Sequence, residues 1–375
     1  MAVYCVSFGV GLIIGFQPPL MALVLQRAGA SGFEIGAVAG ISTVAVMLCA
    51  PLYPRAIKRL GLRSATLLGT AISTAVLPVM PLFPSLQGWL VLRFVTGCAL
   101  GLEWIASETW LNTLSTDQSR GTVMGTYATM FAAGIMAGPL LLRVTGTTGW
   151  MPFGIGSLCL ALTAVPLLFA RQTAVADSGS PQGVRWLRIV HTAPIVMLAA
   201  LIAGVVESAY VSLLPVFALL RGLDERTSLL LVSVFLAGNV ILQLPIGRVG
   251  DRLGRRRVLA LCAGVCVVGP ILLAAVVTVP WLAWPLLLLW GGTMYGFYTQ
   301  GIALLGESYA RAQLAEANTV FVVVYCGGGI VGPSLGGLAM DWWTPNGLLV
   351  FLACVPLLLG VGFAARMHSS GAKAS

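Results

Sequence analysis

Long apolar segments, separated by short polar or turn-rich clusters, follow one another along almost the whole chain. Each segment has about 20 residues, the length that an α-helix needs to cross a bilayer. None shows the alternation of apolar and polar residues that is typical of the strands of a membrane barrel. Only helices or closed barrels satisfy backbone polar groups in lipid, so the pattern predicts an all-α membrane protein. Twelve membrane-spanning helices are expected, at roughly residues 3–26, 34–53, 64–83, 87–109, 120–142, 149–170, 191–219, 227–247, 257–279, 282–306, 313–340 and 345–365.

Composition supports a lipid environment and charge predicts an orientation. Of the residues, 58% are hydrophobic and 9% are charged, and the mean hydropathy is +0.96. The net charge of +9 does not indicate nucleic-acid binding, because the basic residues lie in loops between apolar segments. If the N-terminus is cytoplasmic, the outer loops hold only Arg27, Arg143, Arg221 and Arg226. The positive-inside rule therefore places both termini in the cytoplasm.

The chain also repeats itself. A linker-like stretch from Arg171 to Arg188 separates the sixth and seventh segments. The expected organisation is an N-terminal six-helix bundle at 1–170, a cytoplasmic linker at 171–190 and a C-terminal six-helix bundle at 191–375. The two halves match at an offset of about 194 residues. The matching positions include Arg59-Leu60-Gly61 with Arg252-Leu253-Gly254 and Gly138-Pro139 with Gly332-Pro333. Glu108-Thr-Trp110 also parallels Glu307-Ser-Tyr309, a few residues off that offset.

The densest block of charge lies between the eighth and ninth segments. Gly247, Asp251, Arg252, Gly254, Arg255 and Arg256 stand there at the spacing of a loop signature. With that signature the chain resembles a major facilitator superfamily transporter along its whole length. The family carries the signature most strongly between helices 2 and 3, where this chain has Pro54 and Lys58 in place of Gly and Asp. The resemblance implies a cytoplasmic gate, with Asp251 accepting bonds from helix N-termini or from arginines of the other half. The predicted gating residues are Gly247, Asp251, Arg252, Gly254, Arg255, Glu108 and Glu307.

The fourth segment carries two further resemblances. Arg93, Gly97 and Gly101 resemble the family's helix-4 motif, in which an arginine precedes glycines that admit a neighbouring helix. The family resemblance implies a possible part for Arg93 in proton coupling, with a structural role between helices as the alternative. Glu108-Thr-Trp110-Leu-Asn112 resembles a segment of the YcaD-like branch of the superfamily. Glu103 lies deeper in the same helix, and both a pocket and a packing role stay open for it.

Glu207, in the seventh segment, is the leading candidate for the transport site. A carboxylate within an apolar span is costly, and such residues commonly mark ion or substrate pathways. Its counterpart in the first half is Ile13, so the repeat does not require a charge there. A carboxylate paired for structural reasons is the alternative. The predicted substrate or proton-coupling residues are Glu207, Arg93, Glu103, Gln17, Tyr210, Asn239, Gln243, Tyr298 and Gln300.

These features favour a secondary transporter of a small organic solute that works by alternating access, driven by protons. The expected setting is a bacterial-type inner (plasma) membrane, with the protein as a monomer without a cofactor or a bound metal. A vitamin such as riboflavin or a drug-like compound fits the aromatic residues. Riboflavin and copper importers exist among related facilitators, and Cys262 and Cys266 share one helix face, so copper import stays an alternative. A passive channel or scaffold is another.

An enzyme is not expected. Gly29-Ala-Ser31-Gly32 fits an intramembrane serine protease pattern. The histidines, His191 and His368, both lie at segment edges, so no serine–histidine pair is evident. Ser31 and Glu34 have the spacing of a helix capping box.

Overall fold

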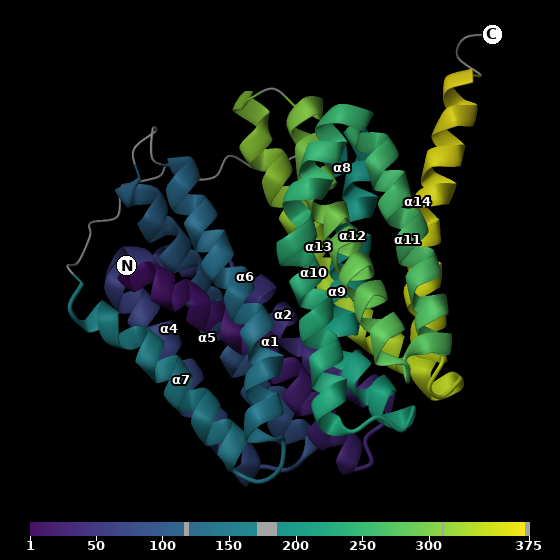
Figure 1. Ribbon diagram of the computed structural model, residues 1–375. Helices are drawn as coiled ribbons and strands as arrows, with labels where there is room; N and C mark the ends of the chain where they lie inside the picture. The colour runs from purple at the N-terminus through teal and green to yellow at the C-terminus, as the bar shows by residue number, and fades with distance from the viewer. Residues whose placement is uncertain (116–119, 171–185, 310, 372–375) are drawn as a thin grey trace. The chain divides into compact units, whose positions relative to one another are not determined.

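The protein is helical throughout the parts of the chain that its computed structural model describes, which are residues 1–115, 120–170, 186–309 and 311–371. No strand occurs within those ranges. The helices, most of them labelled in Figure 1, are α1 (Ala2–Arg27), α2 (Gly32–Cys49), α3 (Tyr53–Leu60), α4 (Leu62–Val76), the 3₁₀ helix η1 (Leu77–Leu82), α5 (Leu86–Leu114), α6 (Arg120–Thr145), α7 (Met151–Leu168), α8 (Trp186–Thr192), α9 (Pro194–Leu220), α10 (Glu225–Leu253), α11 (Arg255–Val276), α12 (Pro280–Ser308), α13 (Arg311–Trp342) and α14 (Gly347–Gly371).

Ten helical segments of the described chain are long and apolar enough to cross a membrane, counting α4 and η1 as one segment. The other two predicted spans, the tenth and the twelfth, correspond to α12, with 29 residues, and to α14, whose described apolar part is shorter than a full span. Two short helices, α3 and α8, were not predicted. A search for apolar segments misses α3, because this helix has only eight residues and carries Arg55, Lys58 and Arg59 among them.

The helix that begins at Gly32 has the predicted capping box. Glu34 accepts a hydrogen bond from the Ser31 backbone N–H at 2.8 Å, and the Ser31 hydroxyl accepts one from the Glu34 N–H at 3.3 Å. The reciprocal pair satisfies backbone donors that a helix start leaves without intrahelical partners. The interpretation of Ser31 as a capping residue is confirmed.

The chain forms two compact units. The first comprises Met1–Ala30, Ala37–Ser180 and Asp224–Ser233, and the second comprises Ser31–Gly36, Pro181–Leu223 and Val234–Ser375. Most of the predicted linker, at 171–185, lies outside the described residues. The predicted domain boundaries therefore stay a prediction.

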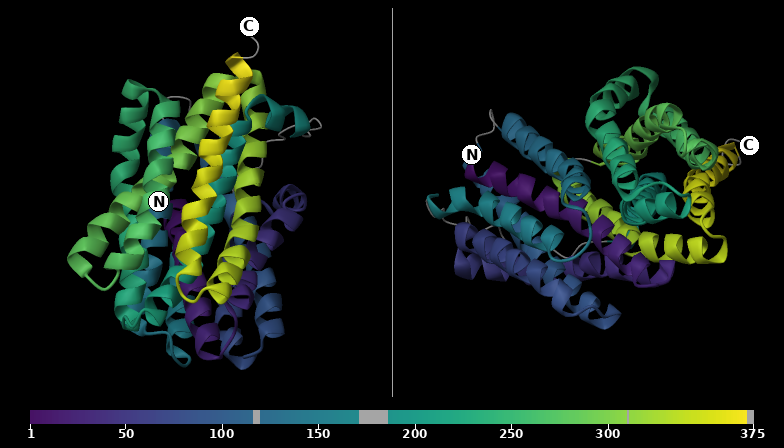
Figure 2. Two further views of the ribbon diagram at one scale, coloured as in Figure 1. Left: turned by 90° about the vertical axis from the view of Figure 1, so that its right-hand side faces the viewer. Right: turned by 60° about the horizontal axis from the view of Figure 1, so that its bottom comes forward.

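In the first unit, α1 lies between α6 and α7 (Figure 2). Glycines on both α1 and α6 allow their backbones to approach closely. A Cβ added at Gly11 would overlap the Phe131 carbonyl, and one added at Gly134 would overlap the Phe8 carbonyl. Small residues at such crossings are what close packing of membrane helices requires.

Glycines allow close helix packing in the second unit as well. There α9 packs along α13, and α11 runs beside α14 (Figure 1). A Cβ added at Gly204 would overlap the Tyr325 carbonyl, and one added at Gly328 would overlap the Leu201 carbonyl. This close contact between α9 and α13 fixes the position of the polar site described next.

Candidate functional site

Glu207 on α9 is the centre of a polar cluster in the second unit. The Tyr295 hydroxyl, on α12, donates to Glu207 Oε1 at 2.7 Å, and the Tyr325 hydroxyl, on α13, donates a short hydrogen bond to Glu207 Oε2. Each carboxylate oxygen therefore has a phenolic donor from a different helix. Glu207 and Tyr325 are partly exposed, whereas Tyr295 is buried.

Aromatic rings continue the cluster away from the carboxylate. The Tyr298 ring on α12 lies edge-on to the Tyr325 ring and to the Phe321 ring, with ring centroids 5.3 Å apart in both pairs. Tyr298 is partly exposed and Phe321 is fully buried. Edge-on rings at this separation attract one another through their quadrupoles, so the three rings support a defined arrangement.

Tyr210, one turn beyond Glu207 on α9, lies in an aromatic cluster. Its side chain is fully buried, stacked on Phe235 with centroids 3.5 Å apart and edge-on to Trp290 at 5.2 Å. Tyr210 therefore supports the packing of α9 against α10 and α12, and its predicted part in the substrate or proton site stays a prediction.

The predicted polar residues of α10 and α12 divide into two groups. Gln243 is exposed and its Nε2 donates to Thr299 Oγ1 at 3.2 Å, while the partly exposed Asn239 lies one turn earlier on the same helix. Gln300 is buried instead, and its Nε2 donates to the Ile246 carbonyl at 3.0 Å. Gln300 thus joins α12 to the α10 backbone in the packed interior.

Arg93 and Gln17, both in the first unit, are brought together. The guanidinium donates a short hydrogen bond to Gln17 Oε1 and a longer one, at 3.4 Å, to the Val38 carbonyl. Both side chains are buried, at 5% and 1% exposure. One turn further along α5, Gly97 faces Ser42 and Ala45 on α2, as the helix-4 resemblance implied. Arg93 therefore holds three helices together through neutral acceptors.

Glu103 is in a packed interior. Its side chain has no exposed surface, and Oε1 accepts a hydrogen bond from the Thr70 hydroxyl at 2.8 Å. Glu103 Oε2 has no hydrogen-bond partner in the described parts of the chain. The neighbouring backbone is close, since a Cβ added at Gly69 would crowd the Glu103 side chain. Of the two alternatives for Glu103, the geometry favours packing.

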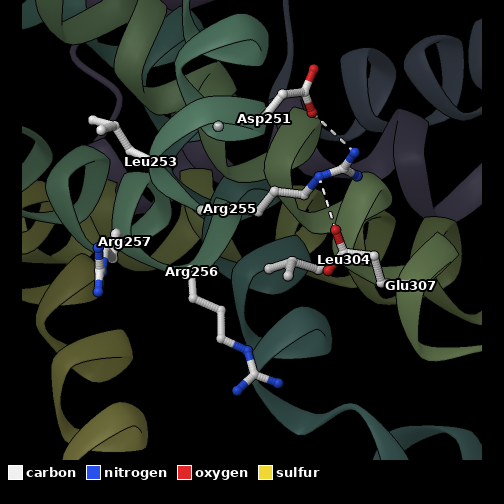
Figure 3. Close-up of a pocket in the computed structure, with 9 residues that line it drawn as sticks. Asp251, Leu253, Arg255, Arg256, Arg257, Leu304 and Glu307 are labelled. Carbon is white, nitrogen blue, oxygen red and sulfur yellow. Dashed lines mark hydrogen bonds and ion pairs between the residues drawn. The ribbon is translucent and has the colours of Figure 1, made fainter.

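The predicted gating loop lines a pocket of about 500 Å³ between the end of α10, the start of α11 and the end of α12. Figure 3 shows Asp251, Arg255 and Glu307 beside one another, with Arg256 and Arg257 pointing away from them. Arg255 forms ion pairs with Asp251 and with Glu307, both at 3.1 Å. These ion pairs of Asp251 and Arg255 lie within the second unit. The predicted bonds of Asp251 with helix N-termini or with arginines of the other half stay a prediction.

The other predicted gating residues lie at the ends of α10 and α5 and at the start of α11. Gly254 begins α11 with a φ of 91°, a backbone conformation that favours glycine. Gly247 and the exposed Arg252 lie near the end of α10. Glu108 is partly exposed on α5. Nothing beyond their positions tests the gating role of these residues, which stays a prediction.

Sequence reasoning missed Tyr295 altogether and did not connect Tyr325 with Glu207. Tyr295 is 88 residues from Glu207 along the chain and on another helix, so no local spacing connects the two side chains. The repeat offers one signal, because Tyr325 is the counterpart of Phe131 and differs from it by the hydroxyl that donates to Glu207.

Helices long enough to span a membrane, two units with the same close helix packing and a partly exposed carboxylate inside an apolar helix are features of a multi-pass membrane transporter. The model of the Major Facilitator Superfamily matches this chain over residues 3–234 and 222–373. The chain belongs to that family.

Two relatives and two solved structures add further context. The chain is 26% identical over 354 residues to the uncharacterized MFS-type transporter YcaD of Escherichia coli, covering 92% of this chain and 90% of that protein. It is 25% identical over 352 residues to the uncharacterized MFS-type transporter YfkF of Bacillus subtilis, covering 91% and 88%. The nucleoside transporter NupG has the same fold, with a TM-score of 0.83 at 16% identity over 98% of both chains. A bacterial homologue of the lysosomal transporter Spinster gives 0.74 at 13% identity, covering 96% of this chain and 93% of that one.

Proposed function

We propose that this transporter moves a small organic solute by alternating access and couples the movement to protons at Glu207. The setting proposed is a bacterial-type inner membrane with both termini in the cytoplasm. One observation carries the proposal: Glu207 is a carboxylate inside an apolar helix whose two oxygens accept hydrogen bonds from Tyr295 and Tyr325. No lysine, arginine or histidine of the described chain forms an ion pair with it.

The physical argument concerns charge balance. An isolated charge within a membrane span is costly, and pairing or protonation removes that cost. A carboxylate with neutral donors and without a basic partner can change its protonation state without breaking an ion pair. Partial exposure gives a proton or a solute access to the group. Glu103 lacks this exposure, since its side chain is fully buried.

The solute proposed is a small organic molecule with an aromatic part. Tyr325, partly exposed, bonds Glu207, and the partly exposed Tyr298 lies edge-on to Tyr325. The Gln243–Thr299 pair supplies polar groups on α10 and α12. Riboflavin and drug-like compounds fit this description. A nucleoside also fits, and the fold of the nucleoside transporter NupG adds a reason to include one in any panel.

Copper import is the second candidate, and one observation favours keeping it. The thiols of Cys49 on α2 and Cys98 on α5 lie 3.2 Å apart, and thiolates are ligands that copper(I) prefers. Cys262 and Cys266, which the sequence suggested, are both buried on α11.

Flux measurements in liposomes test the proposal. Purified protein is reconstituted, and the entry of riboflavin, a nucleoside and copper(I) is measured with and without an imposed pH gradient. We expect flux of an organic solute that rises with the gradient, and loss of that response in Glu207→Gln. Glu34→Gln is the matched control, because glutamine also completes a capping box and Glu34 lies at the start of α2.

Three results would contradict the proposal. Flux that ignores the gradient indicates a passive channel. A gradient response that survives in Glu207→Gln removes Glu207 from the coupling site. Copper(I) as the only transported member of the panel, with flux lost in Cys98→Ser, supports the second candidate.

A further inference from the structure

The surroundings of Glu207 combine a negatively charged group with aromatic rings, and this combination indicates the class of solute. A carboxylate without a basic partner among the described residues lies next to aromatic rings that are partly exposed. From this combination we infer that the solute class is an organic cation, bound by the Glu207 carboxylate and the faces of Tyr298 and Tyr325. The inference rests on the proposed function, because it uses the same site and names its substrate class.

The electrostatic part of the argument starts from Glu207. The hydroxyls of Tyr295 and Tyr325 each donate to one of its oxygens, and both are neutral donors. They orient the carboxylate but leave its charge without a counterion in the part of the chain that the structure describes. A cation that reaches the partly exposed group supplies the missing charge at short range, where the low dielectric strengthens the attraction.

The aromatic part of the argument comes from the neighbouring rings. Tyr298 and Tyr325 are held edge-on to one another with centroids 5.3 Å apart, and the buried Phe321 supports Tyr298 at the same separation. Ring faces attract cations, and an aromatic enclosure beside a negative charge is a common way to bind an ammonium group. Gln300 and Tyr210 do not contribute, because both are buried in helix contacts.

The first half of the chain has a similar pair of aromatic rings but an apolar residue at the position equivalent to Glu207. The counterparts of Tyr298 and Tyr325 are Trp104 and Phe131, whose rings also lie close, with centroids 5.4 Å apart. The counterpart of Glu207 there is the buried Ile13. Aromatic pairs therefore occur in both units, but the position of Ile13 and Glu207 carries a carboxylate in the second unit alone.

Protons and an organic cation should compete for Glu207. Among the described residues, the titratable groups that interact with it are the phenols of Tyr295 and Tyr325 and the thiol of Cys326. Phenols and thiols are ordinarily uncharged where carboxylates titrate, so competition by protons for a permanently charged ligand has to occur at the carboxylate. Exchange of one proton for one monovalent cation conserves the charge of the site.

Binding measurements on the purified full-length protein test the inference with permanently charged probes and uncharged analogues of similar shape. One pair is benzyltrimethylammonium and neopentylbenzene, in which carbon replaces the charged nitrogen. The other is methyltriphenylphosphonium and triphenylphosphine oxide. We expect each cation to bind at least about tenfold more tightly than its neutral partner, and its binding to weaken as the pH is lowered.

Variants locate the binding. Glu207→Gln should weaken cation binding by about tenfold or more and leave the neutral analogues unchanged, while Glu34→Gln should bind as the unaltered protein does. Tyr298→Leu should weaken cation binding about fivefold, and Tyr298→Phe, which keeps the ring, should restore it. The last comparison separates a ring that touches the ligand from one that only packs, because both variants keep a large apolar side chain.

The outcomes distinguish this inference from the proposed function. If neither cation binds more tightly than its neutral partner, or if Glu207→Gln binds both cations normally, the inference is overturned. Flux of a neutral solute that still depends on the pH gradient and on Glu207 would at the same time preserve the proposed function. Cation binding at Glu207 without any response of flux to the gradient would overturn proton coupling and keep the cation site.

Discussion

The helix pair α1–α6 of the first unit and the helix pair α9–α13 of the second unit share one packing scheme but differ in chemistry. Gly11 meets the Phe131 carbonyl in the first pair, and Gly204 meets the Tyr325 carbonyl in the second. The polar groups differ at equivalent positions, with Ile13 in place of Glu207 and Phe131 in place of Tyr325. Both units thus have the close backbone contact, but only the second has ionisable side chains, Glu207 and Tyr325, at these positions.

The comparison teaches that packing and function constrain different positions. Close contact of membrane helices requires small residues at each crossing, so both pairs keep their glycines. A carboxylate within an apolar span has no such packing benefit, because its desolvation is costly. Packing therefore does not explain its presence in α9, whereas the proposed transport role of Glu207 does.

The largest expected effect comes from filling the helix crossings. Gly134→Val on α6 and Gly328→Val on α13 should each destabilise the protein by about 3 kcal/mol, since the added side chain overlaps a neighbouring carbonyl. Thermal unfolding in detergent measures the loss. Gly125→Val and Gly327→Val are matched controls on the same two helices, because a Cβ there meets nothing within 4 Å. Equal losses in variants and controls would contradict the packing account.

The next effect tests the chemical difference between the pairs. Tyr325→Phe makes the second pair resemble the first and removes one hydrogen bond to Glu207, so gradient-driven flux should fall about tenfold. Phe131→Tyr makes the reverse change in the first pair and should leave flux within about twofold. Liposome flux at equal protein content measures both. Similar losses in the two variants would show that the pairs are functionally equivalent.

A smaller effect concerns the starts of two equivalent helices, α2 and α10. Ser31 begins the capping box of α2, and its counterpart Asp224 accepts hydrogen bonds from the Thr227 hydroxyl at 2.5 Å and from the Thr227 N–H at 3.1 Å. Asp224→Ala should cost about 1 kcal/mol in thermal unfolding. Asp224→Asn keeps a capping side chain and should cost less.

The cap of α10 also predicts a dependence on pH. The side-chain and backbone hydrogen bonds from Thr227 lower the pKa of Asp224 below its ordinary value of 3.8. The stabilisation is therefore present above the ordinary aspartate pKa, and it is lost as the pH falls through the lowered pKa of the folded state. Unfolding temperatures of the unaltered protein and of Asp224→Asn should converge at acidic pH. A constant difference between them would contradict this account.

The smallest effect concerns the turns that precede α4 and α11. Gly61 and Gly254 both have positive φ, at 80° and 91°, so both halves of the chain have the same kind of glycine turn before these helices. The second copy adds the ion pair of Arg255 with Glu307 at 3.1 Å, where Glu307 is 58% exposed. A double-mutant cycle with Arg255→Gln and Glu307→Gln should give a coupling free energy of about 0.5 kcal/mol. A coupling several times larger would indicate a pair that is shielded from solvent.

Much of the fold could be predicted because lipid restricts the possible structures. The lengths of apolar segments predicted α1, α9 and α12 to within a few residues, since a backbone without hydrogen-bond partners cannot cross a bilayer. Hydropathy could not predict α3, an amphipathic helix of eight residues in which Tyr53 and Ile57 are buried. Glu207 could be singled out as a candidate, because a carboxylate in an apolar span is rare whatever surrounds it.

The partners of Glu207 could not be predicted from the sequence, for a physical reason. Tyr295 and Tyr325 come from helices far along the chain, and only the packing of α9 with α12 and α13 brings their hydroxyls to the carboxylate. The same applies to Glu103, whose helix face could have been turned to a pocket or to α4. Only the folded structure shows its contacts with Thr70 and Gly69.

The sequence alone determined that the chain is a helical membrane protein with two related halves, and it singled out Glu207 as a candidate site residue. Segment length, charge distribution and repeat spacing are local or periodic quantities that need no knowledge of helix contacts. The tertiary structure alone decided which polar residues meet Glu207 and which, such as Tyr210 and Gln300, are buried in packing. Those outcomes depend on helix rotation and close approach, which are set by long-range contacts between side chains.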